Sequence, residues 1–446
     1  SNTAVGYESL KANTTGASNV AVGAHALDSN TTASANVAVG LDALGGNTTG
    51  GSNTACGHRA LKSNTTGSSN TALGSQVLMN TTASSNTAVG AFAMQNSTTG
   101  SHNTAVGLET LKSNQTGTNN AAFGAGALKN NTSSFNTGIG RHALENNTSG
   151  TKNTGVGNLA LLSNTTGSFN TSLGYDALGD NTTGEKNVAV GSHSLLVNET
   201  GSNNTAVGEA ALNQNTASNN TAIGFESLKL NTTGIKNVAV GSSTLDANID
   251  GENNTALGHN SLSAATSANS NVAVGYNTLD ATTTGGGNTA LGANALTSNT
   301  TGIRNTAIGQ ATLTSNTTAQ FSVAIGYRAL NANTTGMSNV AVGSAALQDN
   351  QTGGSNTAVG RSVLVSNTGD NNTAIGERAL FQNTSGSNNA AFGRRTLYEN
   401  TTGTQNTAVG AQAGDLTTEG DNNTSIGYQA DPSSATADNE VTLGNS

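Results

Sequence analysis

Residues 2–18 read NTAVGYESLKANTTGAS, and the next 17 residues repeat the pattern as NVAVGAHALDSNTTASA. A glycine equivalent to Gly6 recurs along the whole chain, 27 times in all, the last being Gly444. Of the 26 intervals between these glycines, 22 are 17 residues long and four are 16 residues long. A fixed short period indicates a repeat array in which each unit packs on its neighbours, in place of several globular domains.

The four short intervals all lose their residue around the N-T-T-G segment. Surface loops tolerate changes in length better than ordered segments do. We therefore expect N-T-T-G to be a surface loop and N-T-A-V-G to be the ordered part of each repeat.

The N-T-A-V-G segment alternates as a β-strand does. An apolar residue precedes every repeat glycine, as Val5 and Val22 do, and Thr or Val usually stands two residues earlier, with Ala between them. Leu10 and its equivalents form a second apolar series four residues after each glycine. We expect the Val and Leu series to face a narrow core and the Ala and Asn residues to form the opposite face. The sequence thus predicts an all-β fold, a parallel β-solenoid of about 26 coils with 17 residues per coil.

Asn stands four residues before the repeat glycine in 25 of 27 repeats, and we expect these side chains to stack as a structural amide ladder. One coil offers few large apolar side chains against the entropy cost of ordering its residues. The Ala and Asn face is therefore expected to pack against further copies of the chain, most simply in a homotrimer.

Residues 322–326 read SVAIG, and this motif resembles the YadA-like head repeats of trimeric autotransporter adhesins. The longer unit resembles repeat regions of phage tail fibres that precede an endosialidase-type intramolecular chaperone, and residues 425–446 are similar to the segment just before that chaperone. The resemblance implies a left-handed β-roll packed as a homotrimeric rod, and release of the chain by cleavage near Ser446. The repeat is longer than is usual in YadA-like heads, which leaves the path of the coil open.

The chain is predicted to divide into a regular shaft, residues 1–410, and terminal coils, residues 411–446. The terminal coils lose the Leu series, contain the one proline, Pro432, and are rich in acidic residues. We expect them to be a cap or a junction to a missing C-terminal domain. A divalent cation bound among Asp415, Glu419 and Asp421 is a weaker alternative.

Composition excludes several classes of function. Only 9% of the residues are charged and the net charge is -9, which argues against nucleic acid or an anionic membrane as a general partner. No apolar run approaches the roughly 18 residues of a membrane-spanning helix, so no membrane insertion is expected. No G-x-S-x-G motif, phosphate loop or recurring pair of carboxylates is present. We expect no catalytic, cofactor-binding or metal site, and no enzyme activity.

The six histidines occupy separate coils and are not expected to bind metal within one chain: His25, His58, His102, His142, His193 and His259. Cys56 occupies the apolar position before Gly57 and is expected to be a buried thiol of low reactivity. Asn13, Asn30 and their equivalents match the N-x-T glycosylation motif, but the repeat itself imposes that match. The neighbouring Thr pairs raise an ice-binding alternative, which loop residues suit poorly.

Four arginines fall one or two residues after three consecutive repeat glycines: Arg361, Arg378, Arg394 and Arg395. Coils in register would bring them to one corner, as a candidate patch for anionic, sulfated or phosphorylated glycans. Glu377 lies among them, so a solvated and partly neutralised corner is the alternative interpretation.

Together these features predict a non-enzymatic structural fibre without cofactors. We expect an extracellular shaft of a phage tail fibre or bacterial surface appendage that spaces or presents an attachment tip. The alternative is an adhesin head whose surface itself binds glycan, matrix or sister cells. The expected partners are the chain itself, as a homotrimer, and in the alternative a cell-surface glycan or receptor.

Overall fold

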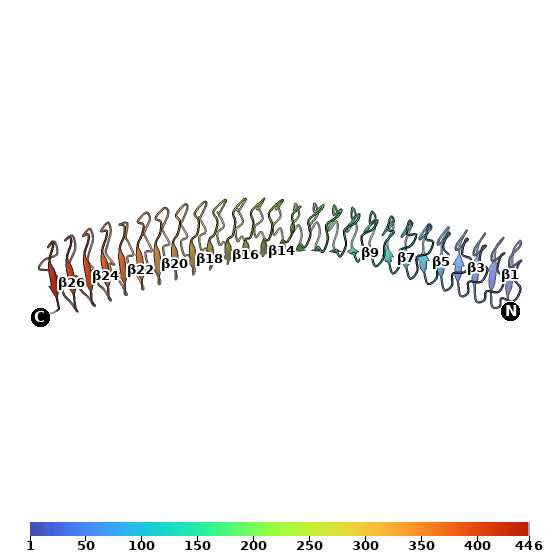
Figure 1. Ribbon diagram of the computed structural model, residues 1–446, viewed down its shortest axis with the longest axis horizontal. Helices are drawn as coiled ribbons and strands as arrows, with labels where there is room; N and C mark the ends of the chain where they lie inside the picture. Colours follow the sequence, from blue (N-terminus) through green and yellow to red (C-terminus); the bar gives the residue numbers. More distant parts are fainter. Residues whose placement is uncertain (445–446) are drawn as a thin grey trace. The chain divides into compact units, whose positions relative to one another are not determined.

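The computed structural model describes residues 1–444, so the predicted cleavage end at Ser446 lies outside the described residues. Within them the chain forms 27 strands of three residues each and no helix. The fold is a parallel β-solenoid of about 26 turns, one repeat per turn, and the all-β prediction is confirmed (Figure 1). The chain divides into two compact units, Ser1–Asn220 and Thr221–Ser446.

Each strand covers the T-A-V part of one repeat. The first unit contains β1 Thr3–Val5, β2 Val20–Val22, β3 Val37–Val39, β4 Thr54–Cys56, β5 Thr71–Leu73, β6 Thr87–Val89, β7 Thr104–Val106, β8 Ala121–Phe123, β9 Thr137–Ile139, β10 Thr154–Val156, β11 Thr171–Leu173, β12 Val188–Val190 and β13 Thr205–Val207. The second unit contains β14 Thr221–Ile223, β15 Val238–Val240, β16 Thr255–Leu257, β17 Val272–Val274, β18 Thr289–Leu291, β19 Thr306–Ile308, β20 Val323–Ile325, β21 Val340–Val342, β22 Thr357–Val359, β23 Thr373–Ile375, β24 Ala390–Phe392, β25 Thr407–Val409, β26 Thr424–Ile426 and β27 Val441–Leu443.

Within each unit, every strand pairs in parallel with the next, and identical repeat positions lie side by side. Thr3 pairs with Val20 and Val5 with Val22, for example. The register survives a 16-residue repeat, since Thr71 still pairs with Thr87. The missing residue is therefore absorbed outside the strand, as the sequence predicts. The terminal coils continue the same ladder, because β26 and β27 also pair in register.

The other two sides of each coil are joined to their neighbours as well. The amide of Leu10 donates a hydrogen bond to the carbonyl of Ala26 at 3.0 Å, and the amide of Thr14 donates to the carbonyl of Thr31 at 2.9 Å. The N-T-T-G segment is thus a packed side of the coil, and only its Thr side chains are exposed to solvent to a large extent.

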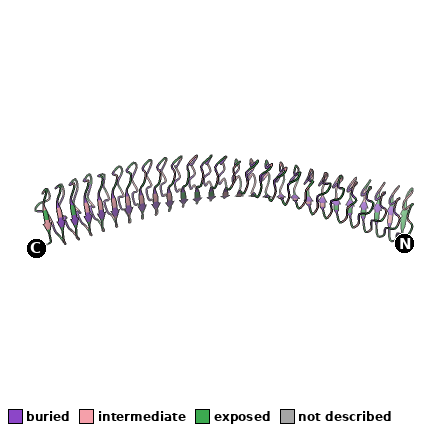
Figure 2. Cartoon of the chain, viewed as in Figure 1, coloured by how far each residue is buried: buried purple, intermediate pink, exposed green. Residues whose placement is uncertain are grey.

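The core of each coil consists of the Leu series and the central Ala of the strand. Leu27 and Ala21 are fully buried, and so are their equivalents in most coils of both units. The first coil is an exception, because Ala4 is exposed and Leu10 is only partly buried. Figure 2 shows the buried residues running through the strands. The predicted Leu series is confirmed as core.

The predicted position of the Val series was wrong. Val39 and Leu73 lie on the outside of the strand, 37% and 48% exposed, whereas the Ala face points inward. The reason is the width of the coil: a Cβ added to Gly138, at an Ala position, would lie 3.2 Å from Cγ of Leu128. A bulky side chain has no room there, so the larger apolar residues of each strand face outward.

The repeat glycine forms the corner after each strand. Gly140 has φ of 132°, and a Cβ at this position would lie 2.2 Å from the carbonyl oxygen of Gly157 in the next coil. Only glycine combines this backbone conformation with such a close approach.

Two columns of buried Asn side chains complete the interior. Asn19, four residues before Gly23, donates from Nδ2 to the carbonyl of Ala33 and accepts at Oδ1 from the amide of Asn36, at 2.9 and 3.0 Å. These residues are structural, as predicted, but most of their hydrogen bonds go to the backbone. Direct amide pairs occur in part of this column, where Asn70 donates to Oδ1 of Asn53 at 3.2 Å. A second column of direct amide pairs is formed by the Asn of N-T-T-G, in which Asn47 donates to Oδ1 of Asn30 at 2.9 Å.

Candidate functional site

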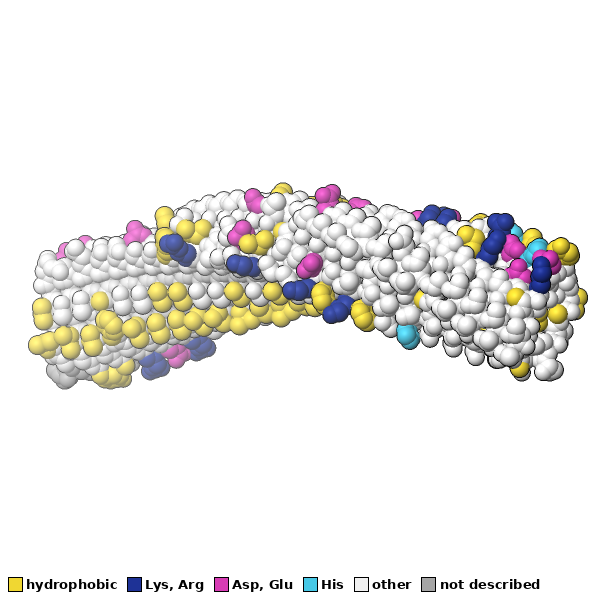
Figure 3. Space-filling view, turned by 45° about the vertical axis from the view of Figure 1, so that its right-hand side comes forward, with side chains coloured by type: hydrophobic (Ala, Val, Ile, Leu, Met, Phe, Trp, Pro, Cys, Tyr) yellow, Lys and Arg dark blue, Asp and Glu magenta, His cyan; other side chains and the backbone are white. Residues whose placement is uncertain are grey.

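The outward face of the strands carries a series of exposed apolar side chains in both units, and we call it the strand face. It consists of the first and third residues of each strand. In the first unit Leu173 is 49% exposed, and in the second unit Leu257 and Leu291 are 47% and 46% exposed. Figure 3 shows hydrophobic side chains (yellow) following this side of the second unit in rows. Contiguous exposed apolar surface of this kind marks an interaction site more often than a solvent face.

Cys56 is the third residue of β4 and therefore lies on the strand face. It is a free cysteine and only partly buried. The prediction of a buried thiol was wrong for the same reason as the Val series: the third strand position points away from the core.

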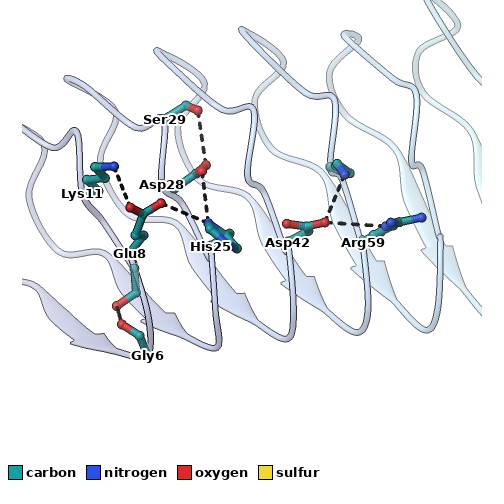
Figure 4. Close-up of polar contacts among 10 residues, drawn as sticks. Gly6, Glu8, Lys11, His25, Asp28, Ser29, Asp42 and Arg59 are labelled. Carbon is teal, nitrogen blue, oxygen red and sulfur yellow. Dashed lines mark hydrogen bonds and ion pairs between the residues drawn. The ribbon is translucent and has the colours of Figure 1, made fainter.

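A corner rich in charges follows the repeat glycines at the start of the first unit (Figure 4). Glu8 accepts from Nζ of Lys11 at 2.7 Å, and His25 Nδ1 lies 3.4 Å from the second oxygen of Glu8. The hydrogen bond from Lys11 lowers the pKa of Glu8. Two coils further on, Asp42 lies 3.0 Å from Nζ of Lys62 and 3.6 Å from Nε of Arg59.

A shallow hollow lies beside this corner because Gly45 and Gly46 contribute no side chains there; His25, Asp42 and Lys62 also line it. Burial raises the pKa of Asp42, but the hydrogen bond from Lys62 and the nearby cationic charges outweigh it, so the pKa is lowered overall. Each acid at this corner has a basic partner. The arrangement is a surface ladder of ion pairs.

A second charge cluster lies on the same side of the first unit. Glu109 accepts from Lys112 and Lys129, with N to O distances of 2.6 and 2.8 Å. These two hydrogen bonds lower the pKa of Glu109 to about 2.

The structure brings the four candidate arginines to one corner of the second unit. Arg361 forms an ion pair with Glu377 of the next coil. The guanidinium of Arg378 lies 5.7 Å from the ring centre of Phe381, and that of Arg395 lies 4.4 Å from the ring centre of Tyr398.

The two rings were not predicted from the sequence. Phe381 and Tyr398 each follow the core Leu of their coil, and they stack with centres 5.3 Å apart and planes 5° apart. The signal was available, because the register that aligns the arginines also aligns the residue after Leu.

The histidines do not assemble into a cluster. The ring of His25 makes a T-shaped contact with that of Tyr7, and His193 makes the same contact with Tyr175. His259 stacks on Tyr276. Within residues 1–444 no group of three or more His, Cys, Asp or Glu side chains is arranged to hold a metal ion.

Asp415 and Asp421 of the terminal coils make separate contacts. Asp421 accepts from the amide and the hydroxyl of Thr404, while burial raises the pKa of Asp415, which lies near Arg395. The part of the chain that the structure describes has no helix of the length and apolar character needed to cross a membrane.

Most Asn residues of the repeated N-T-T motif are not available as glycosylation acceptors in the folded chain, and Asn13 of the first coil is partly exposed. Asn30 and Asn47 are fully buried, and Nδ2 of Asn47 donates to Asn30 and to the carbonyl of Gly50.

No protein-family model matches this chain, and no curated protein matches it either. The resemblance to YadA-like and phage-fibre repeats therefore remains an expectation from the SVAIG motif and the repeat pattern.

Proposed function

We propose that the chain is a non-enzymatic structural fibre protein that associates with further copies of itself through the strand face, most simply as a homotrimer. The observation that carries the proposal is the strand face itself. Every coil within a unit contributes two outward strand positions, usually Thr or Val followed by Val, Ile or Leu, in unbroken register. Burying this surface removes apolar side chains from water, at about 25 cal/mol per Å².

The location of the apolar surface changes the interface expected from the sequence. The Ala and Asn face is enclosed inside each coil and has no surface to offer a second chain. The strand face is the remaining apolar side. Identical repeats would then meet around a symmetry axis, which closed homo-oligomers require.

In this role the protein acts mechanically. Each coil bonds to its neighbours along all three sides, so bending or pulling one coil loads many backbone hydrogen bonds. We propose an extracellular shaft of a phage tail fibre or a bacterial surface appendage that spaces or presents an attachment tip. The resemblance of the repeats to such fibres supports the setting.

The test is the mass of the assembly. Sedimentation velocity of the wild-type chain is expected to give about three times the chain mass of 44.0 kDa. The double variant Leu257→Lys with Leu291→Lys places two charges on the strand face and is expected to shift the mass toward one chain.

The matched control is Leu230→Lys with Met337→Lys. These side chains are equally exposed, at 46% and 53%, but lie off the strand face. The control should keep the wild-type mass. A folded, stable wild-type monomer at micromolar concentration would contradict the proposal, and so would equal loss of assembly in the two double variants.

The alternative function, adhesion by the surface of the solenoid, is favoured by a separate observation, the corner of arginines and rings in the second unit.

A further inference from the structure

Two arginines and two rings occupy neighbouring coils in register. The amide of Arg395 donates to the carbonyl of Glu377 at 2.9 Å, which aligns Arg395 beside Arg378, the residue after Glu377. Phe381 and Tyr398 are aligned in the same way three residues later and stack on each other. We call these four residues, Arg378, Arg395, Phe381 and Tyr398, the arginine–ring corner.

The rings hold the guanidinium groups in place. The guanidinium of Arg395 lies 4.4 Å from the ring centre of Tyr398, within the range of a cation–π contact, and that of Arg378 makes a longer contact with Phe381 at 5.7 Å. A guanidinium that packs on a ring can still donate from the N–H groups at its edge, which match the two oxygens of a carboxylate or sulfate. In Arg395 these donors are the terminal Nη groups, because Nε is buried. The corner is therefore arranged for oxyanions before any ligand arrives.

The corner has more positive charge than its acidic neighbours neutralise. Glu377 forms its ion pair with Arg361. Within residues 1–444, Arg378, Arg394 and Arg395 have no ion pair, and Nε of Arg395 is buried without a hydrogen-bond partner. Like charges aligned in neighbouring strands or coils repel each other, so a bound anion would relieve the repulsion between Arg378 and Arg395.

Two acids mark the edge of this positive surface. Asp415 follows Tyr398 in the column of residues after the core Leu position, and Glu399 is the neighbour of Tyr398 in sequence. Oδ1 of Asp415 is buried and has no hydrogen-bond partner among the described residues. An anion would therefore bind toward Arg378 and Arg394, away from these carboxylates.

We propose that the arginine–ring corner, together with Arg394, binds the carboxylate or sulfate groups of an acidic saccharide. This inference goes beyond the structural role and does not depend on self-association, because none of these side chains belongs to the strand face.

A saccharide fits better than a nucleic acid. The positive surface covers three coils, about 10 to 15 Å at the usual spacing between strands. The second unit as a whole carries eight Lys and Arg against 15 Asp and Glu. A long polyanion would meet repulsion beyond the corner, whereas one or two sugar acids would not.

The test compares retention of the full chain on immobilised alginate, a carboxylated polysaccharide, and on immobilised heparin, a sulfated one. Dextran and single-stranded DNA serve as the neutral and the non-saccharide surfaces. The variant Arg378→Gln with Arg395→Gln is expected to bind at least one of the acidic polysaccharides about tenfold more weakly than wild type. Asp415→Asn is expected to strengthen binding to the same polysaccharide.

The matched control is Arg304→Gln with Arg328→Gln. These are also exposed arginines of the second unit beside aromatic rings, at 5.7 and 5.4 Å, but each stands alone in its column. The control should bind like wild type. Equal retention of wild type and the Arg378 and Arg395 variant, equal loss in the control, or retention only on DNA would each overturn the inference. Sedimentation of the same samples measures their assembly. A failure of the proposed self-association can therefore be distinguished from a failure of saccharide binding.

Discussion

The column of N-T-T-G Asn residues contains a defect whose repair we expect to stabilise the protein. Ala265 occupies this column in one coil and is fully buried. Oδ1 of Asn248, in the coil before it, is buried and has no hydrogen-bond partner among the described residues. We predict that Ala265→Asn fills the gap.

The magnitude follows from an intact part of the column. Asn47 donates from Nδ2 to Oδ1 of Asn30 and to the carbonyl of Gly50, both at 2.9 Å. The same two bonds at residue 265 would be worth about 0.5 to 1.5 kcal/mol each. The conformational entropy lost when the new side chain is fixed costs about 0.5 to 1 kcal/mol. We expect a net gain of about 1.5 kcal/mol, or roughly a tenfold change in the local opening equilibrium.

Hydrogen exchange measured by mass spectrometry is the suitable assay, because a repeat array opens locally and need not unfold in one step. The amides of Ile249 and Thr266, which bond to the carbonyls of Thr266 and Thr283, are expected to exchange about tenfold more slowly. Ala264→Asn, one position away and partly exposed, is the control and should leave exchange unchanged.

The reverse change, Asn47→Ala, should open its coil faster, since it leaves Oδ1 of Asn30 without a donor. If Ala265→Asn leaves exchange unchanged or accelerates it, the column of amide pairs does not stabilise the coils.

Three further predictions concern other features. Gly138→Ala, at a position where most coils carry Ala, should leave the stability of its coil unchanged or raise it by up to about 1 kcal/mol. Gly140→Ala should lower that stability by about 3 kcal/mol or more, because of backbone strain and the clash with Gly157. Equal urea sensitivity of β9 in the two variants would contradict this. Because the pKa of Glu109 is lowered to about 2 from 4.5, its contribution to stability is complete above pH 4.5 and is lost as the pH falls through about 2. In wild type, hydrogen exchange should report a stability about 0.5 to 1 kcal/mol lower at pH 2.5 than at pH 5 from this carboxylate, and Glu109→Gln should remove that difference. Glu185→Gln, at a carboxylate with no ion pair among residues 1–444, should leave the difference unchanged. Finally, if copies meet through the strand face in register, mild oxidation should join two chains through a disulfide between their Cys56 residues and give a band at twice 44.0 kDa on a non-reducing gel. Cys56→Ser is the control and should give no such band. A wild-type chain that is trimeric yet never crosslinks would place Cys56 away from the axis.

The repeat period was sufficient to predict the architecture, because a strand that recurs every 17 residues can stack only on its own copies. The period could not decide which face of the strand is buried. Val39 is the more apolar residue and Ala38 the smaller one, and hydrophobicity alone favours Val39 for the core. The narrow coil reverses this choice, since the space beside Leu44 and its equivalents holds only small side chains, Ala in most coils and Ser172 in one of the others.

The corner of arginines was likewise predictable from the sequence only in part. Register alone placed Arg378 and Arg395 together, because both follow a repeat glycine by two residues. The rings that hold them were not predicted, since a contact between a guanidinium and a ring depends on side-chain geometry. The pairing of Arg361 with Glu377, which removes one arginine from the available positive charge, also required the structure.

The unbroken register across a 16-residue repeat has an evolutionary consequence. A gene built from near-identical units readily gains or loses whole units by unequal recombination, and the product here would still align every strand, because each coil recognises only the two beside it. Each added unit extends the hydrogen-bonded ladder and, in the same step, the surface available to other copies. Selection can therefore adjust the length of such a protein and the strength of its assembly by changing the number of repeats, and no new kind of side-chain contact is needed.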